Sequence, residues 1–218
     1  MAPQKGNGRF DAVLFDFGGV LISSPFEALH ELAVAMELPF PVGDFLEEVF
    51  GPYHQDTDHP WHRIERGEIG FGDYFDDLVG RLAQRGVELD LARFAKTFGG
   101  LQPHEHMVDL VEELSVAGYQ LAMVTNNIAE GREQWGVHAP VDCFDVIIDS
   151  SAVGMRKPDP GIYRLALQEL EVSADRAVFL DDAPGNVDGA RAVGLHAIWV
   201  TGDGRAAEAE LRTLLGLT

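Results

Sequence analysis

Several polar side chains that can attack a substrate, bind a cation or hold an anion occur in four short segments of this sequence. They are Asp16, Thr125, Asn126, Lys157, Asp181 and Asp182. A carboxylate can serve as a nucleophile or as a ligand of a divalent cation, and a lysine beside hydroxyl and amide groups can hold an anion. If the fold brings these groups together, they would form an anion site beside a cation site.

Asp16 follows an unbroken apolar run, Ala12 to Phe15. Such a run is typical of a short strand that is buried on both faces of a parallel sheet. Gly18 and Gly19 then break the strand, so the carboxylate is expected at the strand's carboxyl end, where open α/β sheets bind ligands. From this segment alone, a turn-forming or helix-capping aspartate is the better explanation.

Two further segments place polar groups where they could meet that carboxylate. Thr125 and Asn126 end the apolar run of LAMVTNN before a predicted helix, where they could bind an anion or simply cap the helix. In GMRKPDPGIY, Pro158 restricts Lys157 to an extended backbone and so holds it on a stiff loop. In isolation, a solvated surface lysine is the better explanation of this segment.

The segment AVFLDDAPGNVDGARAVG places two adjacent acids, Asp181 and Asp182, at the end of another apolar strand. With Asp16 they would gather three carboxylates at one sheet edge, which raises the pKa of at least one of them unless a cation is present. Mg²⁺ takes such oxygen ligands, usually one or two carboxylates with water and a substrate phosphate. Since neighbouring side chains diverge, we assign Asp182 to the metal and Asp181, with Asn186, to its support. That assignment could shift by one residue.

The elements that must position these residues alternate between strand and helix in the second half of the chain. Further strands are predicted at residues 120–125, 144–148, 177–181 and 196–200. This alternation indicates a parallel sheet with crossover helices. The segment from Ser24 to Phe98 has helical spacing instead, without strand alternation. The N-terminal strand is therefore expected to join the sheet across an all-helical insertion.

We thus predict an α/β fold with a Rossmann-like parallel-sheet core and an inserted all-helical cap. The core would comprise residues 1–23 and 101–218, and the cap residues 24–100. Ser24 and Pro25 predict a capped helix start at the beginning of the insertion. Gly99 and Gly100 predict a hinge at its end.

Composition narrows the range of partners. The chain has 16 lysines and arginines against 36 acidic residues, a formal net charge of −20. No basic run longer than a pair occurs, so nucleic acid and anionic membranes are not expected as partners. Cys143 is the only cysteine, and residues 1–9 lack the apolar core of a signal peptide. We expect a cytoplasmic monomer or homodimer that acts on a small molecule.

These motifs, in this order, resemble those of the haloacid dehalogenase-like hydrolase superfamily with a helical cap. The likeness covers nearly the whole chain, including ERGEI at residues 65–69. It is greatest to the phosphatase branch that includes the N-terminal domain of soluble epoxide hydrolase and bacterial glucose-1-phosphate phosphatases. The resemblance implies that Asp16 is the nucleophile, that Thr125 and Asn126 bind a phosphoryl group, and that Lys157 bridges this group to Asp16.

The same resemblance implies a magnesium-dependent phosphomonoester hydrolase that acts through an aspartyl phosphate. Asp16, Asp182 and the backbone carbonyl of Gly18 would be the Mg²⁺ ligands. The substrate would be a small phosphorylated metabolite, such as a sugar phosphate or another activated phosphate.

Gly18 departs from the family's pattern, because most phosphatases of the superfamily carry an aspartate there as general acid. Dehalogenases of the superfamily also lack that acid. A metal-free haloacid dehalogenase with the same nucleophile, and a catalytically silent binding protein, are therefore alternatives. The DFGGV sequence and the cluster of Asp181, Asp182 and Asn186 favour the phosphatase.

The predicted cap is expected to set substrate specificity. One polar and aromatic stretch of it contains His54, His59, Trp61 and His62. These side chains could line the substrate pocket, although histidines in an exposed loop are more often solvated than engaged as ligands.

Overall fold

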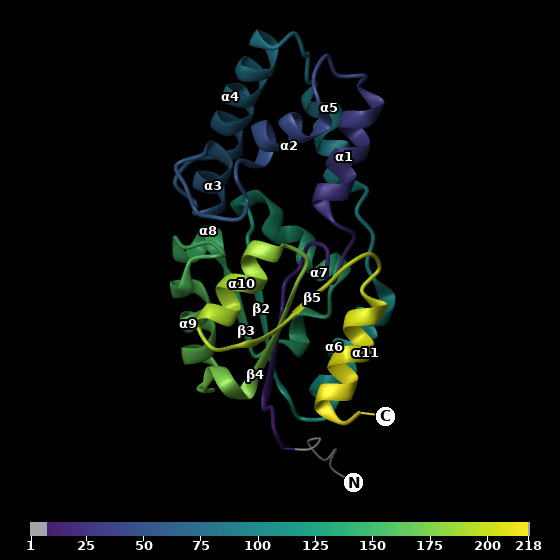
Figure 1. Cartoon of the computed structure of the whole chain (residues 1–218), viewed down its shortest axis with the longest axis vertical. Helices are drawn as coiled ribbons and strands as arrows, with labels where there is room; N and C mark the ends of the chain where they lie inside the picture. Colours follow the sequence, from purple (N-terminus) through teal and green to yellow (C-terminus); the bar gives the residue numbers. More distant parts are fainter. Residues whose placement is uncertain (1–7, 218) are drawn as a thin grey trace.

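The computed structural model describes residues 8–217, and of residues 133 and 134 it describes only the backbone. Residues 1–7, where no signal peptide is predicted, lie outside the described part. A five-stranded sheet occupies the lower part of Figure 1, and a group of helices stands above it. No described helix is long and apolar enough to span a membrane.

All five strands of the sheet run parallel. They are β1 (Ala12–Phe15), β2 (Gln120–Thr125), β3 (Val146–Asp149), β4 (Ala177–Asp181) and β5 (His196–Trp199), in the order β3-β2-β1-β4-β5. In the central strand β1, Phe15 pairs with Met123 on one side and Leu180 on the other. Because Asp16 follows Phe15 and Asp181 follows Leu180, this register sets the two carboxylates side by side at one edge of the sheet.

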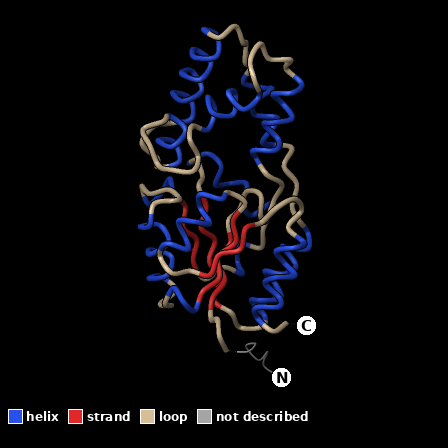
Figure 2. The backbone as a smooth tube through the Cα atoms, in the orientation of Figure 1, coloured by secondary structure: helices blue, strands red, loops and turns tan. Residues whose placement is uncertain are grey.

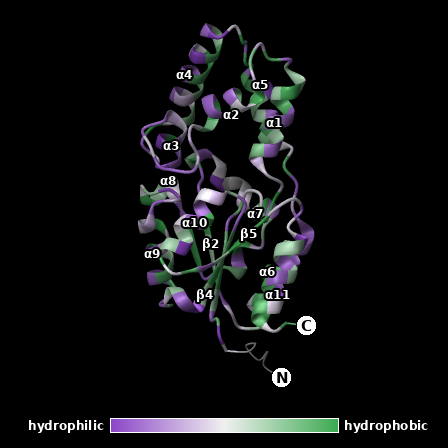
Figure 3. Cartoon of the chain, viewed as in Figure 1, coloured by the Kyte–Doolittle hydropathy of each residue, from purple (hydrophilic) through white to green (hydrophobic). Residues whose placement is uncertain are grey.

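Helices cover both faces of the sheet (Figure 1). One face packs against α6 (Glu105–Val116), α7 (Trp135–His138) and α11 (Arg205–Leu215), and the other against α9 (Pro160–Glu169) and α10 (Pro184–Ala192). The strands are accordingly hydrophobic along their length in Figure 3, as the unbroken apolar runs predict. The remaining short elements of this part are η1 (Ala129–Gln134), η2 (Val141–Cys143), α8 (Ser150–Val153) and η3 (Ala174–Arg176).

Five helices lie between β1 and α6 in the chain. They are α1 (Pro25–Ala35), α2 (Val42–Phe50), α3 (Pro60–Glu65), α4 (Phe71–Gln84) and α5 (Leu91–Gly99). They pack around a separate apolar core, in which Phe45, Tyr74 and Phe94 are fully buried. Figure 2 shows these helices beyond one end of the strands. We call them the cap, while its boundaries at residues 24 and 100 stay a prediction.

The predicted α/β class with a parallel sheet is confirmed. The strands β2 and β4 begin and end where the sequence predicts them. β3 begins at Val146 rather than at residue 144, because the 3₁₀ turn η2 runs to Cys143 and its last bond involves Phe144. The helical spacing did not single out α2 or α3, which are only nine and six residues long.

Ser24 behaves differently from the prediction. It lies at the N-cap of α1 with an extended backbone, but its hydroxyl makes no capping hydrogen bond. Instead, Ser24 Oγ donates to Asp182 Oδ2 at 2.8 Å. The first turn of the cap is thereby tied to the polar edge of the sheet.

Candidate active site

Asp16 lies where the central strand ends, with 8% of its surface exposed. Its Oδ1 atom accepts the backbone N–H of Phe17 at 2.7 Å and lies 2.7 Å from Lys157 Nζ. No described residue donates a hydrogen bond to Oδ2. Since Asp16 also lines a cavity beside the sheet edge, one carboxylate oxygen is held and the other is available to a ligand.

Lys157 is not a surface lysine, because its side chain is fully buried. Its ammonium lies 2.7 Å from Asp16 Oδ1 and 2.7 Å from Asp181 Oδ2. Burial by itself would lower the pKa of Lys157, but attraction by the two carboxylates outweighs burial and raises it. The ammonium is therefore charged and forms a fixed bridge between β1 and β4.

The two adjacent acids face different surroundings, as their sequence spacing predicts. Asp181 is fully buried, and its oxygens accept hydrogen bonds from Ala183 N at 2.8 Å, Asn186 Nδ2 at 3.1 Å and Lys157 Nζ at 2.7 Å. Asp182 is partly exposed, lines the cavity and accepts only the Ser24 hydroxyl among described side chains. Asp182 is therefore the acid that can reach a cation in the cavity, with Asp181 behind it.

The carboxylates of this cluster carry more negative charge than one lysine balances. Burial raises the pKa of Asp16 well above its usual range, with Lys157 opposing the shift and Asp181 and Asp182 adding to it. Burial and then the charge of Asp181 raise the pKa of Asp182 to about 7, although the Ser24 hydroxyl lowers it. A cation among these groups would favour their ionised forms.

These residues fit Mg²⁺. One oxygen from each of Asp16, Asp181 and Asp182 lies within 4.8 Å of the others, and carboxylate oxygens are the ligands this ion prefers. The Oδ1 atom of Asn186 is buried beside them with no hydrogen-bond donor from any described residue. A hydrated cation would supply such a donor.

Gly19 is required for Asp182 to approach the end of β1. Its backbone has φ +73°, and a Cβ atom placed on it would lie 2.0 Å from Asp182 Oδ2. Only glycine meets both conditions, because other residues rarely adopt this conformation and would also displace the carboxylate. The second glycine of DFGGV is thus part of the acidic cluster.

Asn126 has a structural task that the sequence did not indicate. Its Oδ1 accepts the backbone N–H of Lys157 at 2.7 Å, and its Nδ2 donates to the Lys157 carbonyl at 3.0 Å. The amide therefore braces the loop that carries Lys157. Thr125 is buried at the end of β2 and lines the cavity, and the roles of both residues in phosphate binding stay predictions.

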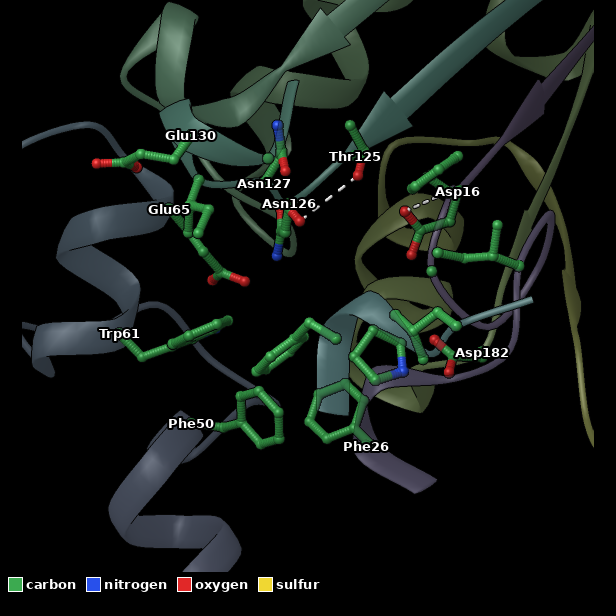
Figure 4. A pocket seen from close by; sticks show the side chains of 18 of the residues that line it. Asp16, Phe26, Phe50, Trp61, Glu65, Thr125, Asn126, Asn127, Glu130 and Asp182 are labelled. Carbon is green, nitrogen blue, oxygen red and sulfur yellow. Dashed lines mark hydrogen bonds between the residues drawn. The ribbon is translucent and has the colours of Figure 1, made fainter. Parts of the chain in front are cut away.

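A cavity of about 470 Å³ lies between the sheet edge and the cap. Figure 4 shows Asp16 and Asp182 on one side of it, with Phe26, Phe50 and Trp61 reaching in from the cap. Much of the wall is formed by rings and aliphatic side chains, including Phe26, Phe50, Tyr53, Trp61, Phe98 and Ile128. Such a volume is typical of small-molecule sites, and its walls are suited to an apolar group.

The predicted specificity residues of the cap are only partly in this wall. Trp61 lines the cavity, whereas the three histidines do not. His59 Nδ1 accepts the backbone N–H of Trp61 at 3.2 Å, and His62 is buried with its Nδ1 accepting the N–H of Thr57 at 3.0 Å. His54 is exposed on the loop before α3. The rings of His59 and His62 instead make hydrogen bonds within the loop before α3 and at the start of α3. A role of the three histidines in substrate specificity stays a prediction.

The sequence interpretation missed several residues at the site. Phe26 in α1 and Phe98 in α5 line the cavity, but their helical spacing in the sequence indicated only that they lie in helices. Glu65 was noticed within ERGEI but given no role, although it lines the cavity and is buried. Arg156 precedes Lys157 and is fully buried, which its charge alone would not suggest.

Comparison with known proteins identifies relatives of the chain. Residues 10–194 match a family model described as haloacid dehalogenase-like hydrolase. The chain is 33% identical to a sesquiterpene phosphatase of Aspergillus oryzae, over 95% of this chain and 97% of that protein. It is 30% identical to bifunctional epoxide hydrolase 2 of Sus scrofa over 94% of this chain, but spans only 39% of that longer protein.

Solved structures share the fold. One is a haloacid dehalogenase family enzyme from Bacteroides thetaiotaomicron, in complex with magnesium and inorganic phosphate, with a TM-score of 0.61. The match covers 88% of this chain and 94% of that one at 18% identity. At that identity, the likeness shows the fold alone.

We expect Gly19→Ala to destabilise the protein and to displace Asp182. A left-handed alanine costs roughly 1–2 kcal/mol, and crowding of a packed site typically adds about 1–3 kcal/mol. For a chain of this length, the melting temperature should fall by roughly 5–15 °C. Differential scanning calorimetry measures the shift. Gly80→Ala, on α4 where a Cβ meets no atom within 4 Å, is the matched control and should not lower the melting temperature.

Proposed function

The chain belongs to the haloacid dehalogenase-like hydrolases, and from that premise we propose that it hydrolyses phosphoric monoesters, with Asp16 as nucleophile and Mg²⁺ as cofactor. The observation that carries the proposal is the cluster in which Lys157 bridges Asp16 and Asp181 while Asp182 faces the cavity. A metal-free dehalogenase or a silent binding protein would have no evident use for these grouped acids.

In the proposed reaction, an oxygen of Asp16 attacks the phosphorus atom while the bond to the ester oxygen breaks. This step gives an aspartyl phosphate and an alcohol, whose oxygen takes a proton from solvent. Water then attacks the same phosphorus atom and releases inorganic phosphate and the free carboxylate. Lys157 holds Oδ1 of Asp16 at 2.7 Å, which leaves Oδ2 for the attack.

Asp16, Asp182 and the carbonyl oxygen of Gly18 would hold Mg²⁺, with Asp181 and Asn186 supporting them. When bound, the ion supplies positive charge that balances the phosphoryl oxygens. Such local charge is needed because the chain as a whole carries −20 and repels an anionic substrate.

Phosphate binding is assigned to the end of β2 and the loop beside it. Thr125 and Asn126 lie there, and Lys157 adds a second fixed positive charge next to Asp16. Because these groups are held before substrate arrives, they cost little reorganisation during the reaction.

The alcohol part of the substrate is proposed to be apolar. A sugar would leave hydroxyl groups unpaired against rings such as Phe26, Phe50 and Phe98, and unpaired polar groups are costly when buried. An apolar group instead gains about 0.8 kcal/mol for each CH₂ that it buries. The similarity to a sesquiterpene phosphatase supports this class ahead of the sugar phosphates favoured from the sequence.

We expect hydrolysis of p-nitrophenyl phosphate that requires Mg²⁺ and Asp16. EDTA should stop the reaction and added Mg²⁺ should restore it. Asp16→Asn should lower kcat by roughly 10³-fold or more, because an amide is too weak a nucleophile for the covalent step. Release of nitrophenol is followed at 405 nm, and circular dichroism checks that the variant is folded. Metal-independent release of halide from 2-chloropropionate, without phosphatase activity, would identify a dehalogenase instead.

Among n-alkyl phosphates, kcat/KM should rise with chain length until the cavity is filled. The leaving-group pKa is nearly constant along this series, so the slope reports burial of the chain. A gain of about 0.8 kcal/mol per CH₂ corresponds to at most about fourfold per carbon. Phe98→Ser should flatten the slope while leaving methyl phosphate unchanged, which serves as the internal control. Faster turnover of sugar phosphates than of octyl phosphate would refute an apolar substrate.

Rates should also fall steeply as the leaving-group pKa rises, because Gly18 supplies no general acid. Such an acid typically contributes about 10²–10⁴ in rate. An aspartate at this position would crowd Pro25, whose Cδ would lie 3.1 Å from the new Cβ. The test therefore compares the parent and Pro25→Ala with Gly18→Asp/Pro25→Ala across substituted aryl phosphates. A shallower slope in the double variant is expected, and a flat slope in the parent would mean that another residue donates the proton.

A further inference from the structure

An ion pair between the cap and the sheet-bearing part is buried beside the cavity. Arg156 lies between α8 and α9 with 0% of its surface exposed, and Glu65 ends α3 with 1% exposed. Their Nε and Oε2 atoms are 2.6 Å apart. Arg156 Nη1 also donates to the carbonyl of Gln55 at 3.2 Å and lies 3.6 Å from Asp56. Residues far apart in the sequence are thus joined through one guanidinium.

Tyr53 extends this contact toward the proposed phosphate site. Its hydroxyl donates to Glu65 Oε1 at 2.8 Å and accepts from Asn126 Nδ2 at 3.4 Å. The guanidinium carbon of Arg156 lies 4.8 Å from the centre of the Tyr53 ring. Asn126 in turn bonds both the N–H and the carbonyl of Lys157. A continuous path of polar contacts therefore leads from α3 to the lysine that holds Asp16.

Charge burial makes this path sensitive to the position of the cap. Figure 4 shows Glu65 projecting from its helix toward Asn126. While α3 is packed against the sheet-bearing part, Glu65 and Arg156 neutralise each other. Removing one partner leaves the other as an unpaired buried charge. A buried pair replaced as a whole by neutral groups is often tolerated. This contrast separates a role in seating the cap from a direct role in chemistry.

We propose that three residues, Arg156, Glu65 and Tyr53, are positioning residues. They couple the packing of α3 against the sheet-bearing part of the chain to the positions of Asn126 and Lys157. The proposal rests on the proposed function only for the role of Lys157 in the reaction. The coupling itself is measurable without substrate, because the Lys157 amide donates to Asn126 Oδ1. Exchange of that amide proton with solvent reports directly on the link.

The test compares Glu65→Gln, Arg156→Met and the double variant with the parent by hydrogen exchange resolved to single amides. In each single variant, the backbone amides of Lys157 and Arg66 should exchange at least tenfold faster than in the parent. The Arg66 amide donates to the His62 carbonyl and so reports on the end of α3. The double variant, which has no stranded charge, should return to within about threefold of the parent. A double variant that exchanges as fast as the single variants would overturn the coupling.

Tyr53→Phe separates the two halves of the path. It removes the hydroxyl and leaves the ion pair, so the Lys157 amide should exchange faster while the Arg66 amide stays unchanged. Asp77→Asn is the control for loss of one cap carboxylate, because among the described residues the ion-pair partner of Asp77 is Arg81, also on α4. It should alter neither amide. An unchanged Lys157 amide in Tyr53→Phe would show that the path does not run through the hydroxyl.

Turnover of p-nitrophenyl phosphate with Mg²⁺ adds the functional readout. The single variants should lose at least tenfold in kcat with a smaller change in KM, and the double variant should recover most of the loss. A double variant that matches the parent in exchange but stays inactive would make Glu65 or Arg156 a direct participant and overturn the positioning role. An inactive parent would refute the proposed function, while the exchange measurements would still decide the coupling.

Discussion

The ammonium of Lys157 lies between the carboxylates of Asp16 and Asp181, 2.7 Å from each, and much of the site depends on this contact. It joins the ends of two neighbouring strands at the one point where the register brings acids together. It also fixes one oxygen of Asp16 and leaves the other toward the cavity. Without a buried cation at this point, the two neighbouring buried carboxylates would repel each other.

Lys157 balances only part of the negative charge of the three clustered carboxylates. The remaining negative charge determines which ligands the site can bind. Asp182 keeps a raised pKa despite its bond to Ser24, which indicates that further positive charge would be favourable there. Much of the remaining wall of the cavity is formed by aromatic and aliphatic side chains. The substrate class proposed above, with an ion and a phosphoryl group at one end and a hydrocarbon chain at the other, would match both parts of the cavity.

Much of the sheet edge was predictable from the sequence, because strand ends and polar residues coincide there. A buried apolar strand directly precedes Asp16, and two others end at Thr125 and at Asp181. Because the strands are parallel, their carboxyl ends, and therefore these residues, lie at the same edge of the sheet. The links made by Ser24, Tyr53 and Glu65 were not predictable in the same way. Each joins the cap to the core across a long sequence separation, and a local pattern carries no information on which polar groups meet after folding.

The contact between Gly19 and Asp182 bears on how descendants of this protein can diverge. A side chain at position 19 and an aspartate at position 182 exclude each other sterically. A lineage could therefore accept a larger residue at position 19 only after position 182 had become smaller or had moved away. Asp182 would thus have to be substituted before Gly19. A variant that keeps Asp182 but has a larger residue at position 19 should rarely survive selection for a folded protein.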